Sequence, residues 1–165
     1  MFKQQTRENT MSYYSQSQGS AILKEEPKLF EPLFVQDNFV DLQSLQRTRV
    51  LLIEDDRTTR RMVARSVGSY CHLTEAFNSG MGISKYKNFD PDIVFLDLEL
   101  PDDNGHNTLK WIMHNDPGAH VVLFSGSCNS HNVGKAMNNG AKGYVPKPFN
   151  ASLMMYHICQ CPKLH

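Results

Sequence analysis

Uninterrupted runs of four apolar residues recur after residue 49, and each run ends in polar residues. They occupy positions 50–53, 93–96 and 121–124. A run without alternation is typical of a strand that is buried on both faces of a sheet. Two weaker strands are predicted at 71–75 and 144–145. The sequence therefore predicts a sheet of five short strands.

Segments with helical spacing of apolar residues separate these strands and follow the last one. The predicted helices cover 58–67, 81–86, 109–114, 133–137 and 151–158. This alternation implies an α/β fold with a parallel sheet, right-handed crossovers and helices on both faces. Such sheets bind ligands beyond the carboxyl ends of their strands. The residues directly after each strand are therefore the candidates for function.

The N-terminal tail, residues 1–46, differs in composition from the rest of the chain. Residues 1–20 are rich in Gln and Ser and poor in aliphatic side chains, so we expect them to be disordered. Segment 29–45 mixes apolar with acidic residues and is expected to be either a strap that packs on the domain or a docking peptide for a partner. The folded domain is expected to span 47–165. A short helix in the tail would have a face made of Val40, Leu42 and Leu45.

Charge, hydropathy and cysteine content limit the class of protein. Lys plus Arg and Asp plus Glu both number 17, so the formal net charge is zero. Nucleic-acid binders usually carry a basic excess, so no nucleic-acid partner is expected. No apolar run reaches the roughly 20 residues that span a membrane, and the N-terminus does not resemble a signal peptide. We therefore expect a cytoplasmic chain without a membrane partner. Its four cysteines are expected to be reduced, and Cys159 and Cys161 to bind no metal.

Ionisable and hydroxyl residues follow four of the predicted strands. In chain order they are Glu54, Asp55, Asp56, Asp97, Ser125 and Lys147. Acids near a helix start and a lysine at the surface are ordinary when taken singly. A carboxylate such as Asp97, directly after a buried strand, is costly unless it is paired or bound to a metal. Converging carboxylates would form a hard oxygen site that suits Mg²⁺.

This set of residues fits the transfer of a phosphoryl group to a carboxylate. Mg²⁺ would screen the repulsion between Asp97 and the incoming group. Lys147 would supply a compact positive charge for one phosphoryl oxygen, and Ser125 a hydrogen bond for another. Asp97 is then the nucleophile.

Four motifs, in order, resemble the receiver domain of response regulators from two-component signalling systems, and in particular the single receivers of chemotaxis. They lie at 50–56, at 93–101 with Gly105, at 121–126 and at 143–149. The resemblance covers residues 48 to about 160. It implies a flavodoxin-like, doubly wound sheet with the strand order 2-1-3-4-5.

The resemblance also implies a Mg²⁺ site. Asp97 corresponds to the phosphoacceptor, and Asp55 and Asp97 to direct metal ligands. Glu54 would act on the metal through water, and the backbone carbonyl of Glu99 would complete the ligands that the protein provides. Asp56 extends the acidic run and is given no ligand role.

Ser125 and Lys147 stand at the hydroxyl and lysine positions of the family, whose Lys–Pro bond is usually cis. Tyr144 corresponds to a switch aromatic that turns inward when Ser125 moves toward the phosphoryl group. Alternatively, Tyr144 is a half-buried residue that packs on the neighbouring helix. The downstream protein is expected to bind the face formed by the last two helices and the strand between them. Residues expected around this face are His131, Lys135, Asn138 and Tyr144.

The function expected from the resemblance is a signalling switch. Asp97 would receive its phosphoryl group from a sensor histidine kinase or a histidine phosphotransfer protein, and output would be a protein–protein contact. The chain would not be an enzyme beyond its own phosphorylation and dephosphorylation. A phosphatase of the haloacid dehalogenase type would need a second Asp where Glu99 stands. The other alternative is a phosphorylation-independent scaffold whose N-terminal tail binds the partner.

Overall fold

The computed structural model describes residues 34–35, 38–39, 42–126 and 130–164. Two short antiparallel strands, β1 (Phe34–Val35) and β2 (Asn38–Phe39), come first. Residues 1–20, which are expected to be disordered, lie outside the described residues. So do Val40 and most of the N-terminal part of the segment 29–45.

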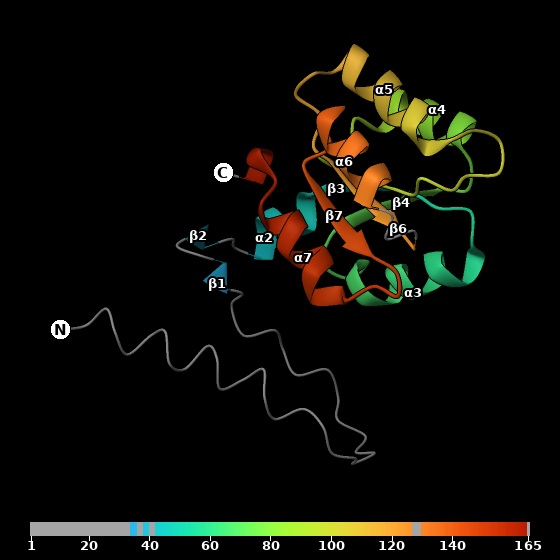
Figure 1. Cartoon of the computed structure of the whole chain (residues 1–165). Coiled ribbons are helices and arrows are strands. Elements are labelled where there is room, and N and C mark those ends of the chain that lie inside the picture. The colour runs from blue at the N-terminus through green and yellow to red at the C-terminus, as the bar shows by residue number, and fades with distance from the viewer. Residues whose placement is uncertain (1–33, 36–37, 40–41, 127–129, 165) are drawn as a thin grey trace. The chain divides into compact units, whose positions relative to one another are not determined.

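A five-stranded parallel sheet forms the centre of the fold (Figure 1). Its strands, in spatial order, are β4 (His72–Ala76), β3 (Arg49–Ile53), β5 (Ile93–Leu96), β6 (Val121–Ser125) and β7 (Gly143–Pro146). Counted along the chain from β3, this is the order 2-1-3-4-5, and every neighbouring pair is parallel. The predicted flavodoxin-like topology is therefore confirmed. The strand order reverses at β3, so a ligand crevice is expected beyond β3 and β5.

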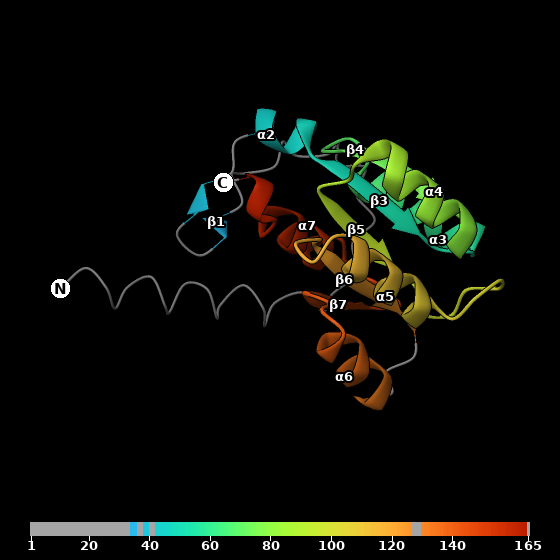
Figure 2. The same ribbon diagram turned by 90° about the horizontal axis from the view of Figure 1, so that it is seen from above.

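Helices cover both faces of the sheet (Figures 1 and 2). They are α3 (Arg57–Val67), α4 (Ser79–Phe89), α5 (Gly105–Asn115), α6 (Ser130–Asn138) and α7 (Ala151–Cys159). Helices α3 and α7 contribute to one apolar core, and α4, α5 and α6 to the other. Among the described residues, no helix is long and apolar enough to cross a membrane.

The apolar runs supply both cores because successive side chains of a strand point to opposite faces. In β3, Val50 and Leu52 belong to the core under α3 and α7, whereas Leu51 and Ile53 belong to the core under α4 and α5. All four are fully buried. Burial on both faces explains why the predicted strands lack alternation.

Helices α4 and α5 begin earlier than the apolar spacing predicts, whereas α7 begins at the predicted residue 151. Helix α5 starts at Gly105 rather than 109, and Asn104 caps it by accepting a hydrogen bond from His106 N. Helix α4 starts at Ser79 rather than 81, and Asn78 caps it in the same way through Met81 N. Their first turns hold small or polar residues, so a search for apolar periodicity misses them. The capping side chains mark the true starts.

The helix α2 (Leu42–Arg47) precedes the sheet, and Leu45 joins the core beside α7 with 5% of its surface exposed. The prediction that Leu42 shares this packed face is wrong, because Leu42 is 56% exposed. In a helix of under two turns, only the residue closer to β3 reaches the core.

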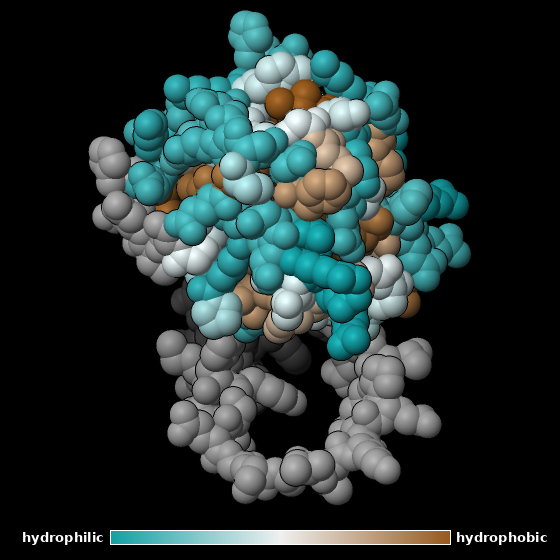
Figure 3. Space-filling view, turned by 90° about the vertical axis from the view of Figure 1, so that its right-hand side faces the viewer, coloured by the Kyte–Doolittle hydropathy of each residue, from teal (hydrophilic) through white to brown (hydrophobic). Residues whose placement is uncertain are grey.

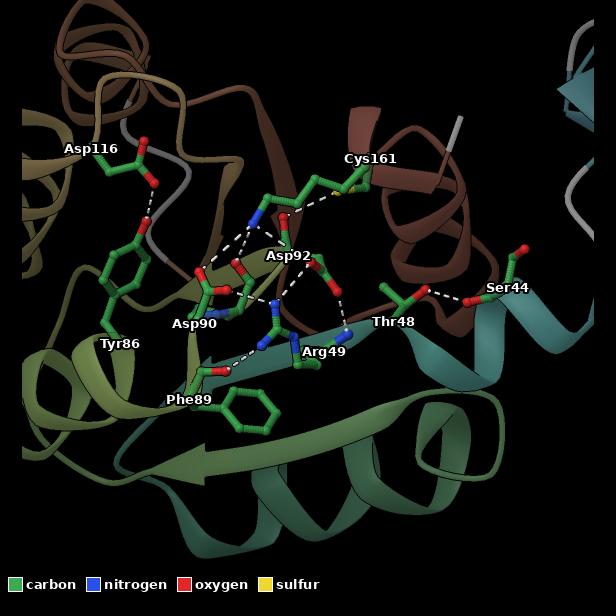
Figure 4. A network of polar contacts seen from close by, with 11 residues as sticks. Ser44, Thr48, Arg49, Tyr86, Phe89, Asp90, Asp92, Asp116 and Cys161 are labelled. Atoms are coloured by element: carbon green, nitrogen blue, oxygen red, sulfur yellow. Dashed lines mark hydrogen bonds and ion pairs between the residues drawn. The ribbon is translucent and has the colours of Figure 1, made fainter.

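A polar network ties both ends of the domain to the loop between α4 and β5 (Figure 4). The Arg49 guanidinium donates to Asp90 Oδ2 at 2.7 Å, and Arg49 N donates to Asp92 Oδ2 at 2.7 Å. The buried thiol of Cys161 donates to the Asp92 carbonyl at 3.1 Å. Cys71, Cys159 and Cys161 are all buried free thiols.

Candidate functional site

Three carboxylates converge where β3 and β5 end. Glu54 and Asp55 follow β3, Asp97 follows β5, and one oxygen from each lies within 4.8 Å of the others. Asp97 N donates to Ile53 O at 2.9 Å, which continues the ladder between the two strands. Glu54 and Asp97 are buried, whereas Asp55 is exposed. The exposed Asp55 opens the cluster to solvent, which suits Mg²⁺ because this ion keeps several waters when it binds.

The ammonium of Lys147 lies between two of these carboxylates. Its Nζ lies 2.5 Å from Asp97 Oδ2 and forms an ion pair with Glu54 Oε2. Burial alone would lower the pKa of Lys147, but hydrogen bonds to Asp97 and Glu54 outweigh burial and raise it. Burial raises the pKa of Glu54, and Lys147 offsets part of that rise. One cation thus compensates two buried acids. The bond from Lys147 to Pro148 is cis.

Ser125, the last residue of β6, is fully buried beside this cluster. Its carbonyl accepts hydrogen bonds from Lys147 N and from Tyr144 Oη, each at 3.1 Å. The Tyr144 ring is half-buried against the core under α5 and α6. The Ser125 carbonyl therefore contacts both Lys147 and Tyr144, the aromatic residue expected to act as a switch.

The loop after Asp97 is tightly folded. Glu99 N donates to Asp97 Oδ1 at 3.0 Å, and Glu99 forms a β-bridge with Asn104. Gly105 N donates to Leu98 O at 3.0 Å. A Cβ at Gly105 would lie 2.2 Å from the Asp97 carbonyl oxygen, so a side chain does not fit there. The backbone of Glu99 is thereby held next to Asp97.

Residues 50–158 match the sequence model of the response regulator receiver domain. The chain belongs to this family. It is 35% identical over 105 residues to the chemotaxis protein CheY of Thermotoga maritima, which covers 62% of this chain and 88% of that protein. Receiver domains are the phosphorylation switches of two-component signalling, and they bind Mg²⁺ at an acidic pocket.

Solved structures show the same receiver fold. A CheY-like receiver domain protein from Methanospirillum hungatei has a TM-score of 0.66 and 24% identity, and the match covers 72% of this chain and 94% of that one. A CheX–CheY complex with BeF₃ and Mg²⁺ from Borrelia burgdorferi has a TM-score of 0.64 and 26% identity, with 67% and 86% covered.

The receiver surface at the carboxyl ends of the strands is mainly polar. The arrowheads of β3 and β5 point to the right in Figure 2, and Figure 3 shows the surface on that side, where hydrophobic patches are small and separate. Asp56 takes no part in the carboxylate cluster. The Asp56 side chain caps α3 by accepting a hydrogen bond from Thr59 N at 2.6 Å.

The face expected to carry output is partly described. Lys135 and Asn138 are exposed on α6, and Tyr144 lies on β7, whereas the side chain of His131 is outside the described residues. Met137 on α6 is 42% exposed and Tyr156 on α7 is 39% exposed. The sequence analysis did not single out these two side chains.

Two further residues that the sequence analysis missed contact this receiver's site. Arg60 donates to the backbone carbonyls of Glu54 and Asp55. The ring centroid of Phe124 lies 5.0 Å from Lys147 Nζ, a distance at which a ring face attracts a cation. Arg60 stands four residues after the acidic run, one helical turn away, and that spacing is the only sequence signal for its role.

Proposed function

We propose that this receiver accepts a phosphoryl group on Asp97 from a histidine kinase or a histidine phosphotransfer protein. The observation that carries the proposal is the position of Asp97, within reach of two other carboxylates and in contact with the Lys147 ammonium. This arrangement provides a nucleophile, a compensating cation and oxygen ligands for a metal in one place. Residues 47–165 form the receiver in this proposal, and 1–46 its tail.

The chemistry is an exchange of bonds at phosphorus. A carboxylate oxygen of Asp97 attacks the phosphorus of a phosphohistidine, the P–N bond breaks, and its electron pair stays on the imidazole nitrogen. The product is an acyl phosphate. In a separate hydrolytic step, water attacks phosphorus and the P–O bond to Asp97 breaks. This step releases inorganic phosphate and a proton and restores the carboxylate.

The chain's own residues position the group. Asp55, Asp97 and the Glu99 carbonyl would hold Mg²⁺ directly and Glu54 through water, and the bound ion would neutralise charge on the phosphoryl oxygens. Lys147 transfers its contact from Asp97 to a phosphoryl oxygen. The Ser125 hydroxyl donates to another oxygen. These groups orient the reacting centre rather than react themselves.

The switch is proposed to run through Ser125. Its carbonyl already accepts from Tyr144 Oη and from Lys147 N, so a displacement of Ser125 toward the phosphoryl group acts on both residues. Phosphorylation adds nearly two negative charges, and the Tyr144 ring converts this change into a new surface on α6, β7 and α7. That surface would bind the downstream protein.

The test is incubation with Mg²⁺ and acetyl phosphate, read by intact mass. We expect one added phosphate on the wild type and none on Asp97→Ala. Asp103→Asn is the matched control, because Asp103 lies in the same loop and, within the part of the chain that the structure describes, its side chain accepts hydrogen bonds only from Asn104 and Asn107. That control should be phosphorylated like the wild type.

A wild type that gains no phosphate, and binds no beryllofluoride with Mg²⁺, would contradict the proposal. It would favour the scaffold alternative, in which the tail binds the partner independently of Asp97. Beryllofluoride binding without a lasting adduct would instead show a phosphoryl group that is lost quickly.

A further inference from the structure

Arg60 lies near the start of α3, and its guanidinium binds the backbone of the loop between β3 and α3 that carries the acidic pair. Its Nη1 donates to the Glu54 carbonyl at 2.8 Å and to the Asp55 carbonyl at 2.6 Å. The Arg60 side chain is only 15% exposed. The side chains of the same two residues belong to the carboxylate cluster with Asp97. Arg60 thus contacts the backbone behind the cluster rather than the cluster itself.

A carboxylate on the edge strand of the sheet also contacts the guanidinium. Arg60 Nε lies 3.4 Å from Glu75 Oε2, on β4. Lys85 Nζ donates to the Glu75 carbonyl at 2.5 Å, which ties this strand to α4. The planar fork of an arginine can face two partners at once in a way that a lysine cannot. Arg60 therefore joins the β3–α3 turn to β4.

Holding the two carbonyls restricts rotation of the peptide groups at the turn. The direction of each Cα–Cβ bond is then restricted as well, and with it the place of each carboxylate. We propose that Arg60 is a positioning residue that preorganises Glu54 and Asp55 for Mg²⁺. The inference rests on the function proposed above and adds to it a residue that supports the metal site.

If only the charge of Arg60 mattered, its removal would change the Mg²⁺ affinity in the opposite direction. A guanidinium close to a cation site repels the cation, so its removal would tighten Mg²⁺ binding if position did not matter. Loss of a residue that orients metal ligands typically weakens metal affinity by about 10- to 100-fold. The sign of the change therefore separates the two roles.

The test is calorimetric titration with Mg²⁺ of the full chain and three variants. We expect Arg60→Leu to weaken Mg²⁺ binding by about tenfold. Arg60→Lys keeps the charge but loses the planar set of guanidinium donors, and it should also bind Mg²⁺ more weakly than the wild type. Arg61→Leu is the matched control, since Arg61 is exposed on the same turn. It removes the same charge and should leave binding unchanged or slightly tighter.

The dependence of acetyl phosphate labelling on Mg²⁺ gives a second readout. In Arg60→Leu the half-saturating Mg²⁺ concentration should rise, while the rate at saturating Mg²⁺ stays within about twofold of the wild type, because Mg²⁺ binding itself draws the carboxylates into place. A loss of folding would instead lower the labelled fraction at every Mg²⁺ concentration. If Arg60→Leu does not fold, Arg60→Lys carries both measurements.

Mg²⁺ binding by Arg60→Leu and Arg60→Lys as tight as in the wild type, or tighter, would overturn the inference. If the wild type binds Mg²⁺ and is labelled on Asp97 while both variants match it, only the role of Arg60 falls. A wild type that binds no Mg²⁺ would overturn the proposed function together with it.

Discussion

Charge balance governs the site at the scale of single residues. Glu54 is fully buried and Asp97 is 3% exposed, yet both are acids. Removing one partner of a buried ion pair leaves an uncompensated charge, which costs about 3–5 kcal/mol when burial is complete. Lys147 compensates both acids, while Asp55 faces solvent. The site therefore keeps a negative excess that favours a divalent cation.

Gly105 is a second residue on which the site depends. Because its missing Cβ would lie 2.2 Å from Asp97 O and 2.7 Å from Leu98 Cα, Gly105→Ala must displace the backbone beside the proposed phosphoacceptor. We expect the free energy of unfolding to fall by about 1–3 kcal/mol and labelling by acetyl phosphate to slow. Urea denaturation and intact mass would measure these effects.

Gly134 provides the control for this substitution. A Cβ there meets nothing within 4 Å, so Gly134→Ala should raise the free energy of unfolding by about 0.5–1 kcal/mol through helix propensity. Equal stability of Gly105→Ala and the wild type would show that the loop gives way more easily than its contacts indicate.

At the scale of elements, short segments outside the sheet add to the receiver. Helix α2 lies before the residues that match the family, which begin at 50. Thr48 directly follows this helix, and its Oγ1 donates a hydrogen bond to Ser44 O at 2.9 Å, which caps the C-terminal end of the helix. Lys163, in the C-terminal 3₁₀ helix Pro162–Leu164, lies 3.6 Å from Asp92. Both segments pack where the strands begin, away from the carboxylate cluster.

Leu45 is the side chain that attaches α2 to the core. Leu45→Ala should lower the free energy of unfolding by about 3 kcal/mol, since it removes a buried side chain and leaves a cavity. Leu42→Ala on the exposed face should change it by less than about 0.5 kcal/mol. Chemical denaturation of both variants decides the matter, and equal effects would mean that α2 does not pack through Leu45.

At the scale of the whole molecule, Mg²⁺ binding is linked to stability. A ligand that binds only the folded chain stabilises it by about 2.7 kcal/mol at a concentration 100 times its Kd. We expect added Mg²⁺ to raise the Tm of the wild type. Asp55→Asn should abolish the rise, because it removes one proposed ligand. Thermal melts with and without Mg²⁺ measure this, and Ca²⁺-free buffers avoid competition. A rise of the same size in Asp55→Asn would place the ion elsewhere.

Protonation of two histidines is also linked to the free energy of unfolding. Burial lowers the pKa of His120 and of His157 below the ordinary value of 6.5. The unfolded chain then binds more protons than the folded one below that value, so the stabilising contribution is complete above about pH 6.5 and is lost as pH falls. We expect the free energy of unfolding to decrease from pH 7.5 to 5.5, as measured by urea denaturation.

His157→Gln tests the source of this dependence. The His157 ring packs against Gly143, where a Cβ would lie 2.3 Å from the ring, so the variant loses stability at both pH values. The decrease between them should nevertheless be smaller than in the wild type. An unchanged decrease would assign the pH dependence to other groups.

The order of residue types along the chain was enough to predict a parallel α/β sheet and the edge at which the candidate site lies, and the resemblance to receivers supplied the strand order. Runs such as 93–96 are typical of strands that are buried on both faces of a parallel sheet, and parallel strands bring their carboxyl ends to one edge. For that reason Asp97, Ser125 and Lys147 could be placed together although they are far apart in sequence. The starts of α4 and α5 were missed because caps, not apolar periodicity, determine them.

Only the tertiary structure decided which groups balance which charges. Lys147 shares its ammonium between Glu54 and Asp97, and Arg60 holds the acidic turn from behind. The exposure of Leu42 beside a buried Leu45 also depends on where α2 meets the domain. Side-chain direction and distance across elements determine these contacts, and a linear pattern carries neither.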